Sequence, residues 1–340
     1  MKLIILLLLI TYSFSSDINE YWPLKGINIE VRDKNISDQD IKNIVSTKMN
    51  LIILNLEFDL FQNEFKLDSK ETIIQILKET KRIINLAKNH NIKVIVGFTN
   101  LPNIEYKETT KANFWNKNNI TNIYNLCEEI VLNLYLLDET LLGYKFLDEP
   151  LIIKEKENNV PDDWINIQKN IINIIRNIDK ERYVVVTSGP GGTGRNFNKF
   201  IPINDDKIIY GFHFFEPHSY THQGINNKEK GIGYPSLTNN HILLEYYMKS
   251  IILFKEKYNL PILAGSFSVV HDAEGNNKYL NDVIDIFDKY SFSWAYWCYK
   301  GYKKWNINND FSDNNYIDKQ LNSSRWKLLK NKIEQEIKEK

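Results

Sequence analysis

The sequence is poor in cysteine and has no net charge. Its 340 residues include two cysteines, Cys127 and Cys298, and neither has a partner at the spacing of a metal site. We place one in a helix and the other in a strand, so a disulfide can form but is not implied. Lysine plus arginine and aspartate plus glutamate are equal at 43 each, which leaves no basic surplus to bind nucleic acid or an anionic membrane. This balance favours a neutral ligand.

Long apolar runs are absent as well. No stretch reaches the ~20 apolar residues that a membrane-spanning helix needs, so we predict no membrane span. The short apolar run at residues 3–10 follows Lys2 and precedes Ser13-Phe14-Ser15, a pattern typical of a secretory signal with its cleavage site. We therefore predict a signal peptide at residues 1–16 and a secreted or extracytoplasmic mature chain at residues 17–340.

The sequence does contain a regular alternation of strand and helix. The predicted strands are continuously apolar, which is typical of a parallel sheet covered by helices on both faces. Eight strand-then-helix units with no linker between them match a closed (β/α)8 barrel, an α/β fold, better than a doubly wound sheet. We therefore predict a single domain. The predicted strands are residues 25–31, 51–58, 93–98, 143–150, 183–187, 208–214, 261–265 and 293–299, and the predicted helices are residues 37–48, 68–91, 119–135, 162–178, 240–258, 278–290 and 324–340.

The fourth predicted strand ends in Leu147-Asp148-Glu149-Pro150. The proline removes an N–H and holds the residue before it in extended geometry, so the chain leaves the strand there. A carboxylate at the edge of an apolar core is either paired or used, and we predict that Glu149 lies in a functional site. In such a barrel the active site lies where the strands end. The other polar or aromatic residues at predicted strand ends are Glu30, Glu57, Asn100, His213, Ser266 and Trp297.

Four motifs at barrel spacing give a more specific indication. They are Leu-Asp-Glu-Pro after strand four, Gly-Phe-His-Phe-Phe-Glu-Pro-His-Ser-Tyr-Thr-His-Gln-Gly at strand six, Leu-Ala-Gly-Ser-Phe-Ser-Val at strand seven and Trp-Ala-Tyr-Trp at strand eight. Together they resemble the cellulase family, family 5 of the glycoside hydrolases, from about residue 25 to the last helix. The resemblance implies a secreted retaining β-glycosidase with two carboxyls about 5 to 5.5 Å apart. It implies no metal and no cofactor, and a polysaccharide or glycoconjugate as the partner.

The resemblance assigns positions residue by residue. Glu149 matches the acid/base, His213 the strand-six histidine near the nucleophile, and Trp297 the tryptophan that floors a sugar subsite. The nucleophile glutamate of the family falls on Ser266. A serine hydroxyl is neutral, and nothing adjacent in the sequence offers a base to activate it, so it does not easily replace a carboxylate.

Other positions also depart from the family pattern. Asp148 stands for the asparagine before the acid/base, which would raise a carboxyl pKa if both acids point inward. Phe215 stands for a tyrosine that contacts the nucleophile. The strand-two arginine and the strand-three histidine are missing from residues 51–58 and 98–100. These losses concern one covalent step, so they indicate a lineage released from catalysis.

The loop after strand six holds the remaining candidates. Glu216 is the best substitute carboxylate on the rim, with Glu57 second, because a water held for direct displacement needs carboxyls ~6.5 to 9.5 Å apart. Glu216 and His222 join Asp148, Phe215 and Trp297 as candidate substrate-binding residues. His213, His218 and His222 have the spacing of metal ligands, but we expect them in a loop and predict no metal site. Trp115, Trp305 and Tyr299 are candidates for stacking in the cleft, with packing as the alternative.

The sequence thus supports three hypotheses about function. The leading one is a secreted, cellulase-like barrel that binds a β-linked glycan or glycoconjugate, with hydrolysis impaired or lost because Ser266 replaces the nucleophile. The second is an active, endoglucanase-like β-glycosidase that uses Glu149 with an unconventional partner. The third is a scaffold for protein interactions without catalysis. Whether the protein is an enzyme therefore stays open.

Overall fold

A computed structural model of the chain describes residues 22–33, 36–102, 117–147, 164–226, 228–312 and 314–339. The predicted signal peptide and three candidate site residues, Asp148, Glu149 and Trp115, lie outside these residues. The described helices include none that is long and apolar enough to cross a membrane.

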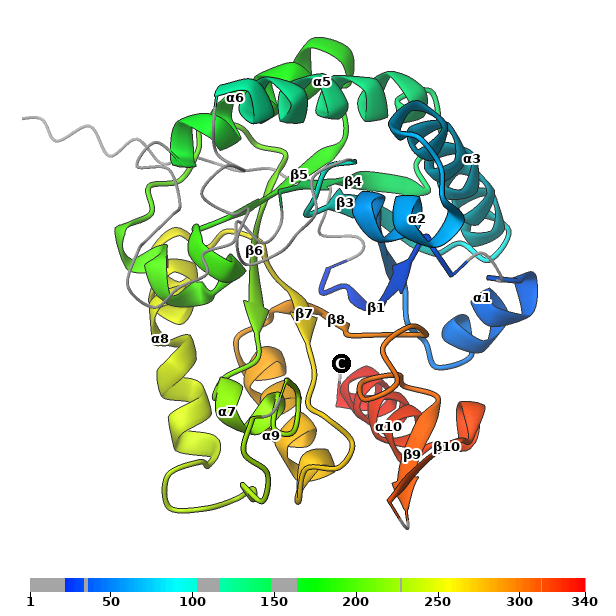
Figure 1. The fold of residues 1–340 in the computed structure, drawn as a ribbon. Coiled ribbons are helices and arrows are strands. Elements are labelled where there is room, and N and C mark those ends of the chain that lie inside the picture. The colour runs from blue at the N-terminus through cyan, green and yellow to red at the C-terminus, as the bar shows by residue number, and fades with distance from the viewer. Residues whose placement is uncertain are drawn as a thin grey trace, which may run out of the picture.

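The eight predicted strands form a closed parallel barrel, in which β1 pairs with both β2 and β8 (Figure 1). The predicted (β/α)8 fold is therefore confirmed. The strands are β1 (Lys25–Glu30), β2 (Leu51–Asn55), β3 (Lys93–Phe98), β4 (Leu141–Phe146), β5 (Tyr183–Thr187), β6 (Ile208–Phe214), β7 (Ile262–Phe267) and β8 (Ser293–Tyr296).

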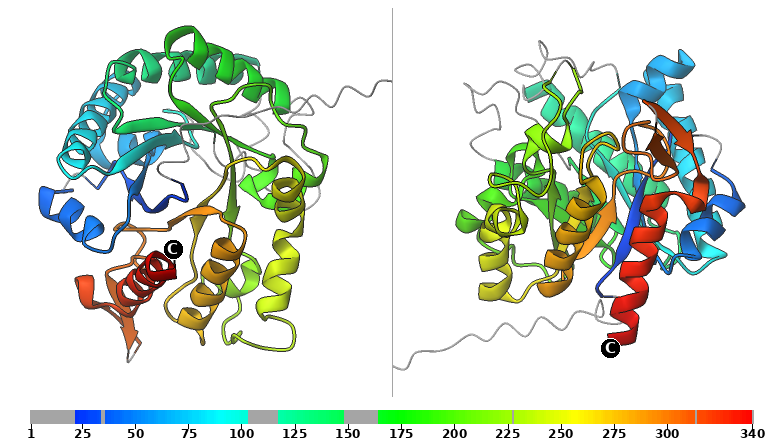
Figure 2. Two further views of the ribbon diagram at one scale, coloured as in Figure 1. Left: turned by 180° about the vertical axis from the view of Figure 1, so that it is seen from behind. Right: turned by 90° about the horizontal axis from the view of Figure 1, so that it is seen from below.

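Helices surround the strands on the outside of the barrel (Figure 2). The last helix, α10 (Ser324–Glu339), runs beside β1, where Glu336 lies 3.1 Å from the Lys25 ammonium. The other described helices are α1 (Asp38–Val45), α2 (Phe58–Phe65), α3 (Ser69–Lys88), α5 (Lys117–Leu134), α6 (Trp164–Ile178), α7 (His218–Thr221), α8 (His241–Tyr258) and α9 (Asn276–Lys289), with short 3-10 turns η2 (Pro190–Gly192), η3 (Gly194–Lys199) and η4 (Gln320–Asn322).

The apolar strands supply two separate cores. Alternate residues of a strand point to opposite faces, so in β2 Leu51 and Ile53 fill the barrel interior while Ile52 and Leu54 pack against the helices. All five residues of β2 are buried. Both faces of the strands are thus covered, which explains why the sequence shows continuous apolar runs in place of alternation.

The ends of β1, β2, β4, β7 and β8 differ from prediction, and the differences at β2, β7 and β8 change where a described candidate site residue lies. β2 ends at Asn55, because Glu57 accepts the first helical hydrogen bond of α2, a helix absent from our prediction. β7 continues to Phe267, so Ser266 lies within the strand. β8 ends at Tyr296, so Trp297 follows the strand.

Two further features were not predicted. A hairpin of β9 (Asn309–Ser312) and β10 (Asn315–Asp318) precedes the last helix. The two cysteines are both buried and unbonded, so the disulfide left open by the sequence is not formed.

The buried side-chain amide of Asn28 forms hydrogen bonds between strands near the carboxyl end of the barrel. Asn28 of β1 is fully buried, and its Nδ2 donates to the carbonyl of Gly265 in β7 at 3.0 Å and to the carbonyl of Ala295 in β8 at 3.3 Å. Its Oδ1 accepts from Asn55 of β2 at 3.1 Å. Buried polar groups must be hydrogen-bonded to be tolerated, and here the bonds connect four strands.

Close packing in the barrel predicts a cost for adding one methyl group. A Cβ on Gly26 of β1 would lie 2.7 Å from the Cβ of Leu51 and closer still to the Leu51 carbonyl. We expect Gly26→Ala to lower the free energy of unfolding by about 2 kcal/mol, because overpacking a rigid core costs about 1–3 kcal/mol. The measurement is urea unfolding. Gly233→Ala serves as the control, since its nearest contact is the flexible end of Glu274 at 3.3 Å. Equal losses in both variants would contradict the prediction.

Candidate active site

The described candidate residues of strands six to eight meet at the carboxyl end of the barrel. His213 and Ser266 are direct partners in the pairing of β6 with β7. They are 9% and 4% exposed, so only a small part of each is open to solvent. The N–H of Trp297 donates to the carbonyl of Phe267 at 3.1 Å, which ties the tryptophan to the same strand end. The structure thus places His213, Ser266 and Trp297 at the same end of the barrel.

A buried lysine points toward this strand end. Lys145 of β4 is 1% exposed, and its Nζ lies 3.0 Å from the point that a Cβ on Gly265 would occupy. His213 approaches the same point, with its Cδ2 at 3.9 Å. An ammonium group therefore reaches across the barrel to the residue that precedes Ser266. Sequence analysis missed Lys145, although a charged residue inside the apolar run Leu-Leu-Gly-Tyr-Lys-Phe was a signal that could have found it.

Aromatic rings form a continuous row from β8 to the loop after β6. The rings of Trp297 and Tyr302 are 5.8 Å apart, those of Tyr302 and Trp305 6.1 Å, and those of Trp305 and His222 5.0 Å. Phe215 continues the row at 5.2 Å from His222. Ring contacts of this kind give a rigid apolar surface with polar edges, which suits stacking on a sugar. Trp305, a stacking candidate in the sequence, is buried in the hydrophobic core, whereas Tyr302, which sequence analysis missed, is exposed.

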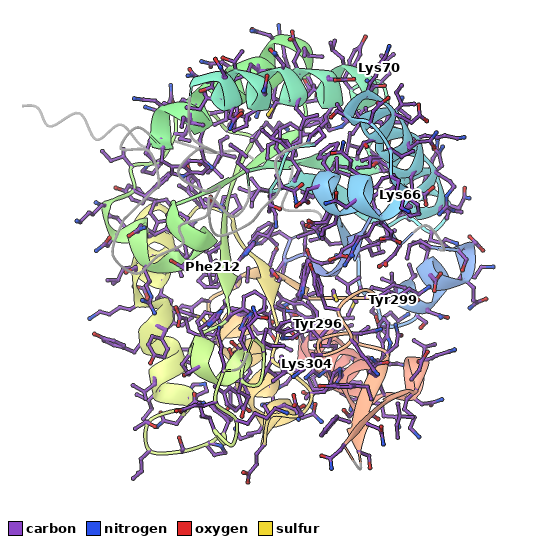
Figure 3. All side chains as sticks on the ribbon, viewed as in Figure 1. Lys66, Lys70, Phe212, Tyr296, Tyr299 and Lys304 are labelled. Carbon is purple, nitrogen blue, oxygen red and sulfur yellow. The ribbon has the colours of Figure 1, made fainter. Side chains whose placement is uncertain are left out.

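Not all predicted aromatic candidates join this row. Tyr299, which is labelled in Figure 3, is buried. It donates a hydrogen bond to Asp40 at 2.5 Å, and its ring packs on Trp326 of α10 at 6.1 Å. It is a packing residue, which was the alternative that the sequence left open.

The histidine pair after β6 does not match the predicted loop. His218 begins the short helix α7, and His222 ends it, which places their rings in a stack 3.9 Å apart. Burial, with the neighbouring charges of His218 and Lys228, lowers the pKa of His222 to about 3. Among the residues that the structure describes, no group of three or more His, Cys, Asp or Glu could hold a metal ion.

Hydrogen bonding defines the proton position on His222. The hydroxyl of Thr221 donates to the carbonyl of Phe215 at 2.6 Å, so the same oxygen must accept from His222 Nδ1, 2.9 Å away. The neutral imidazole therefore carries its proton on Nδ1 and presents Nε2 as an acceptor.

The predicted rim carboxylate Glu216 is held by an ion pair. Arg195 Nη2 lies 2.6 Å from its Oε1, and the backbone carbonyl of Glu216 accepts from Tyr279 at 2.8 Å. The charge of the carboxylate is thus compensated by Arg195.

Two carboxyls at the ends of β1 and β2 have strongly shifted pKa values. Burial, and after it the charges of Glu30 and Asp59, raises the pKa of Glu57 to about 8, although Asn100 Nδ2 donates to its Oε2 at 3.1 Å. Burial raises the pKa of Glu30 to about 7, against the opposing effect of Arg32, whose Nε donates to Glu30 Oε2 at 2.5 Å. The sequence marked both residues as strand-end acids, but their protonation near neutral pH depends on their surroundings in the fold.

Comparison with known proteins gives one consistent family. The family model for cellulase, glycosyl hydrolase family 5, matches residues 16–303. Endoglucanase C of Acetivibrio thermocellus is 20% identical over 304 residues, covering 79% of this chain and 85% of that protein. Cellodextrinase A of Ruminococcus flavefaciens is 22% identical over 299 residues, covering 79% and 83%.

Solved structures of glucanases have a similar fold. A hyperthermophilic endo-β-1,4-glucanase in complex with substrate superposes with a TM-score of 0.71 at 16% identity, over 92% of this chain and 97% of that one. Cel5A of Thermotoga maritima in complex with cellobiose gives 0.70 at 19% identity, with the same coverage. The barrel is thus shared, and the family resemblance of the sequence is confirmed.

The raised pKa of Glu57 predicts a dependence of stability on pH. A carboxyl that holds its proton more tightly when folded favours the folded state at low pH, and this contribution is lost as pH rises from the ordinary value of 4.5 toward about 8. We expect Glu57→Gln to reduce the loss of stability between those limits by about 2 kcal/mol, less than the whole shift implies because the residue is partly exposed. Urea unfolding across this pH range is the measurement.

The control for this test is Glu256→Gln, which removes an exposed carboxyl from α8. If Glu57→Gln and Glu256→Gln lose stability with pH as the unmodified protein does, the proton is not held by Glu57.

Proposed function

Because the chain belongs to the cellulase family, family 5 of the glycosyl hydrolases, we propose that it is a secreted protein that binds a β-linked glycan or glycoconjugate at the barrel mouth, with hydrolysis impaired or lost. The observation that carries this proposal is the buried, neutral Ser266 on β7, where the family resemblance expects the glutamate nucleophile. Export is supported by the signal-like pattern of residues 1–16.

The charge around Ser266 supports impaired hydrolysis. Glycoside hydrolysis passes through an oxocarbenium-like transition state, which a carboxylate stabilises by its negative charge. Here the corresponding side chain is a hydroxyl, and the ammonium of Lys145 reaches the neighbouring Gly265. A neutral hydroxyl does not supply the negative charge that stabilises a developing positive charge.

The two substitute carboxylates considered from the sequence, Glu216 and Glu57, do not compensate. Glu216 is engaged by Arg195, and a raised pKa keeps Glu57 protonated at neutral pH, so it is neither a ready nucleophile nor a ready base. His213 is the nearest described titratable partner of Ser266 along the sheet, but its role at that position is carried over from the resemblance alone.

Glycan binding is supported by the aromatic row. Its rings run from Trp297 through Tyr302 and Trp305 to His222 and Phe215. Trp305 is buried, so the exposed ring of Tyr302 and the half-buried ring of Trp297 are the faces open to a sugar. Stacking of a sugar on these rings does not depend on the nucleophile, so glycan binding can persist when hydrolysis is lost.

Sensitive detection of released sugar tests the loss of hydrolysis. We expect the unmodified protein to release no more product from β-glucans, β-mannans and aryl β-glycosides than Glu149→Gln does, because the covalent step has no carboxylate nucleophile. Product from the unmodified protein that disappears in Glu149→Gln would overturn the proposal in favour of an active glycosidase.

Binding of soluble β-linked oligosaccharides tests the second half of the proposal. We expect Trp297→Ala to weaken binding about tenfold, equivalent to ~1.4 kcal/mol, because it removes a stacking face. Isothermal titration calorimetry is the measurement. Trp22→Ala is the control, since Trp22 is a partly exposed tryptophan at the opposite end of the barrel, where it donates to the Ser291 carbonyl at 3.2 Å. Absence of binding in the unmodified protein would favour the scaffold hypothesis.

A further inference from the structure

The most exposed ring of the aromatic row, that of Tyr302, is carried by a tightly held backbone. Tyr302 is 38% exposed, and the other rings of the row are buried or half-buried. The backbone carbonyl of Tyr302 accepts hydrogen bonds from the N–H groups of Trp305 and Asn306, both at 2.9 Å. Just before it, the N–H of Tyr299 donates to the carbonyl of Asn28 in β1 at 2.9 Å. The segment that bears the ring is therefore fixed to the barrel.

A fixed backbone does not by itself fix the ring of an exposed tyrosine. The side chain can still rotate about its own bonds, and it loses this freedom when a ligand stacks on it. That loss of entropy lowers the affinity for the ligand. A neighbouring group that holds the ring in one orientation before the ligand arrives removes part of this cost.

Arg32 is in a position to hold the ring of Tyr302. It lies in the turn after β1, and its guanidinium carbon is 5.4 Å from the centre of the ring. This distance is that of a cation–π contact, in which the face of an aromatic ring attracts a cation. The side chain of Arg32 is only partly exposed, so the contact is partly shielded from water. Such shielding strengthens the attraction.

The guanidinium group is itself held by a buried carboxylate. Arg32 Nε donates to Glu30 Oε2 at 2.5 Å, and the side chain of Glu30 has no exposed surface. The residue before Tyr302 is Gly301, and a Cβ there would lie 3.2 Å from Glu30 Oε2. Because position 301 has no side chain, the backbone that carries Tyr302 can lie against Glu30. Arg32 thus has a buried anchor on one side and the ring of Tyr302 on the other.

The remaining ring contacts of Tyr302 are with two tryptophans. Its ring lies 5.8 Å from that of Trp297, with the two planes inclined by 35°. It meets the ring of buried Trp305 almost at a right angle, 6.1 Å away. Of the two faces open to a sugar, that of Trp297 is half-buried and that of Tyr302 is exposed. The exposed ring is therefore the one whose orientation depends most on Arg32.

We propose that Arg32 is a positioning residue for glycan binding. Anchored on Glu30, it holds the ring of Tyr302 beside Trp297, so that a sugar meets both rings already in place. This inference rests on the proposed glycan-binding function and adds the residue that prepares its most exposed ring. Arg32 acts on the sugar through Tyr302.

A double-mutant cycle, measured by calorimetric titration, tests the inference. The probes are soluble β-linked oligosaccharides of glucose and of mannose. We expect Arg32→Met, which removes the guanidinium group, to weaken binding about fivefold, the size of a partly exposed cation–π contact. We expect Tyr302→Ala to weaken binding about tenfold, because a stacking face is lost. In the Tyr302→Ala background, Arg32→Met should cause no further loss, since the ring through which it acts is absent.

Two further variants distinguish positioning from a general loss of structure. Arg32→Lys keeps a cation that can lie over the ring, and we expect it to recover part of the affinity that Arg32→Met loses. If Arg32→Met does not fold, the same cycle is measured with Arg32→Lys. Arg82→Met is the control, because Arg82 pairs with Glu79 at 2.6 Å on the outer helix α3. It should bind the oligosaccharides as the unmodified protein does.

The outcomes separate this inference from the function on which it rests. If the arginine variant weakens binding by the same factor with and without the Tyr302 ring, Arg32 does not act through Tyr302 and the inference is wrong. It is also wrong if Arg32→Met or Tyr302→Ala binds as tightly as the unmodified protein. These results leave the glycan-binding proposal intact. If the unmodified protein binds neither oligosaccharide, both proposals are wrong.

Discussion

Closure of the barrel between β1 and β8 is the constraint on which the mouth depends. Only a closed ring of strands brings the ends of β1, β4, β7 and β8 to one small area, although they lie far apart in the sequence. Asn28 reinforces that closure, because one buried amide bonds to carbonyls of both β7 and β8. Its remaining acceptor is used by Asn55, so the amide is satisfied without water. The polar layer below the mouth is therefore part of the framework.

The mouth built on this framework has different chemistry on its different sides. Aromatic rings follow β6 and β8, the acids Glu30 and Glu57 lie at the ends of β1 and β2, and Lys145 reaches the strand end of β7 from β4. Each kind of side chain comes from a different part of the chain. An extended ligand lying across the mouth would meet these surfaces in sequence, which is how a cleft can distinguish one saccharide from another.

Sequence patterns were sufficient to predict most of the fold and part of the candidate site. Strands three, five and six were predicted to the residue, because apolar runs bounded by polar residues are a local signal. The end of β2 was predicted too late, since the apolar residues Phe58 and Phe61 belong to a helix that packs on the barrel and look the same as a strand extension. Local pattern alone does not separate those two outcomes.

Side chains that meet only after folding were harder to predict. Tyr302 joins the mouth from a segment beyond β8, and Glu57 acquires its raised pKa from burial and from acids on other elements. Lys145 was missed for the same reason. Its side chain reaches Gly265, which lies 120 residues later in the sequence, so their proximity is visible only in the folded barrel. The family resemblance supplied positions for His213, Ser266 and Trp297, and no local signal in the sequence would have joined them.

The approach of Lys145 to Gly265 also matters for any attempt to place a carboxylate at position 266. A glutamate there would directly follow the residue that the ammonium group approaches. Pairing between the two groups would lower both the basicity and the nucleophilicity of that carboxylate. Position 145 is therefore a second position to vary wherever a nucleophile is engineered into β7.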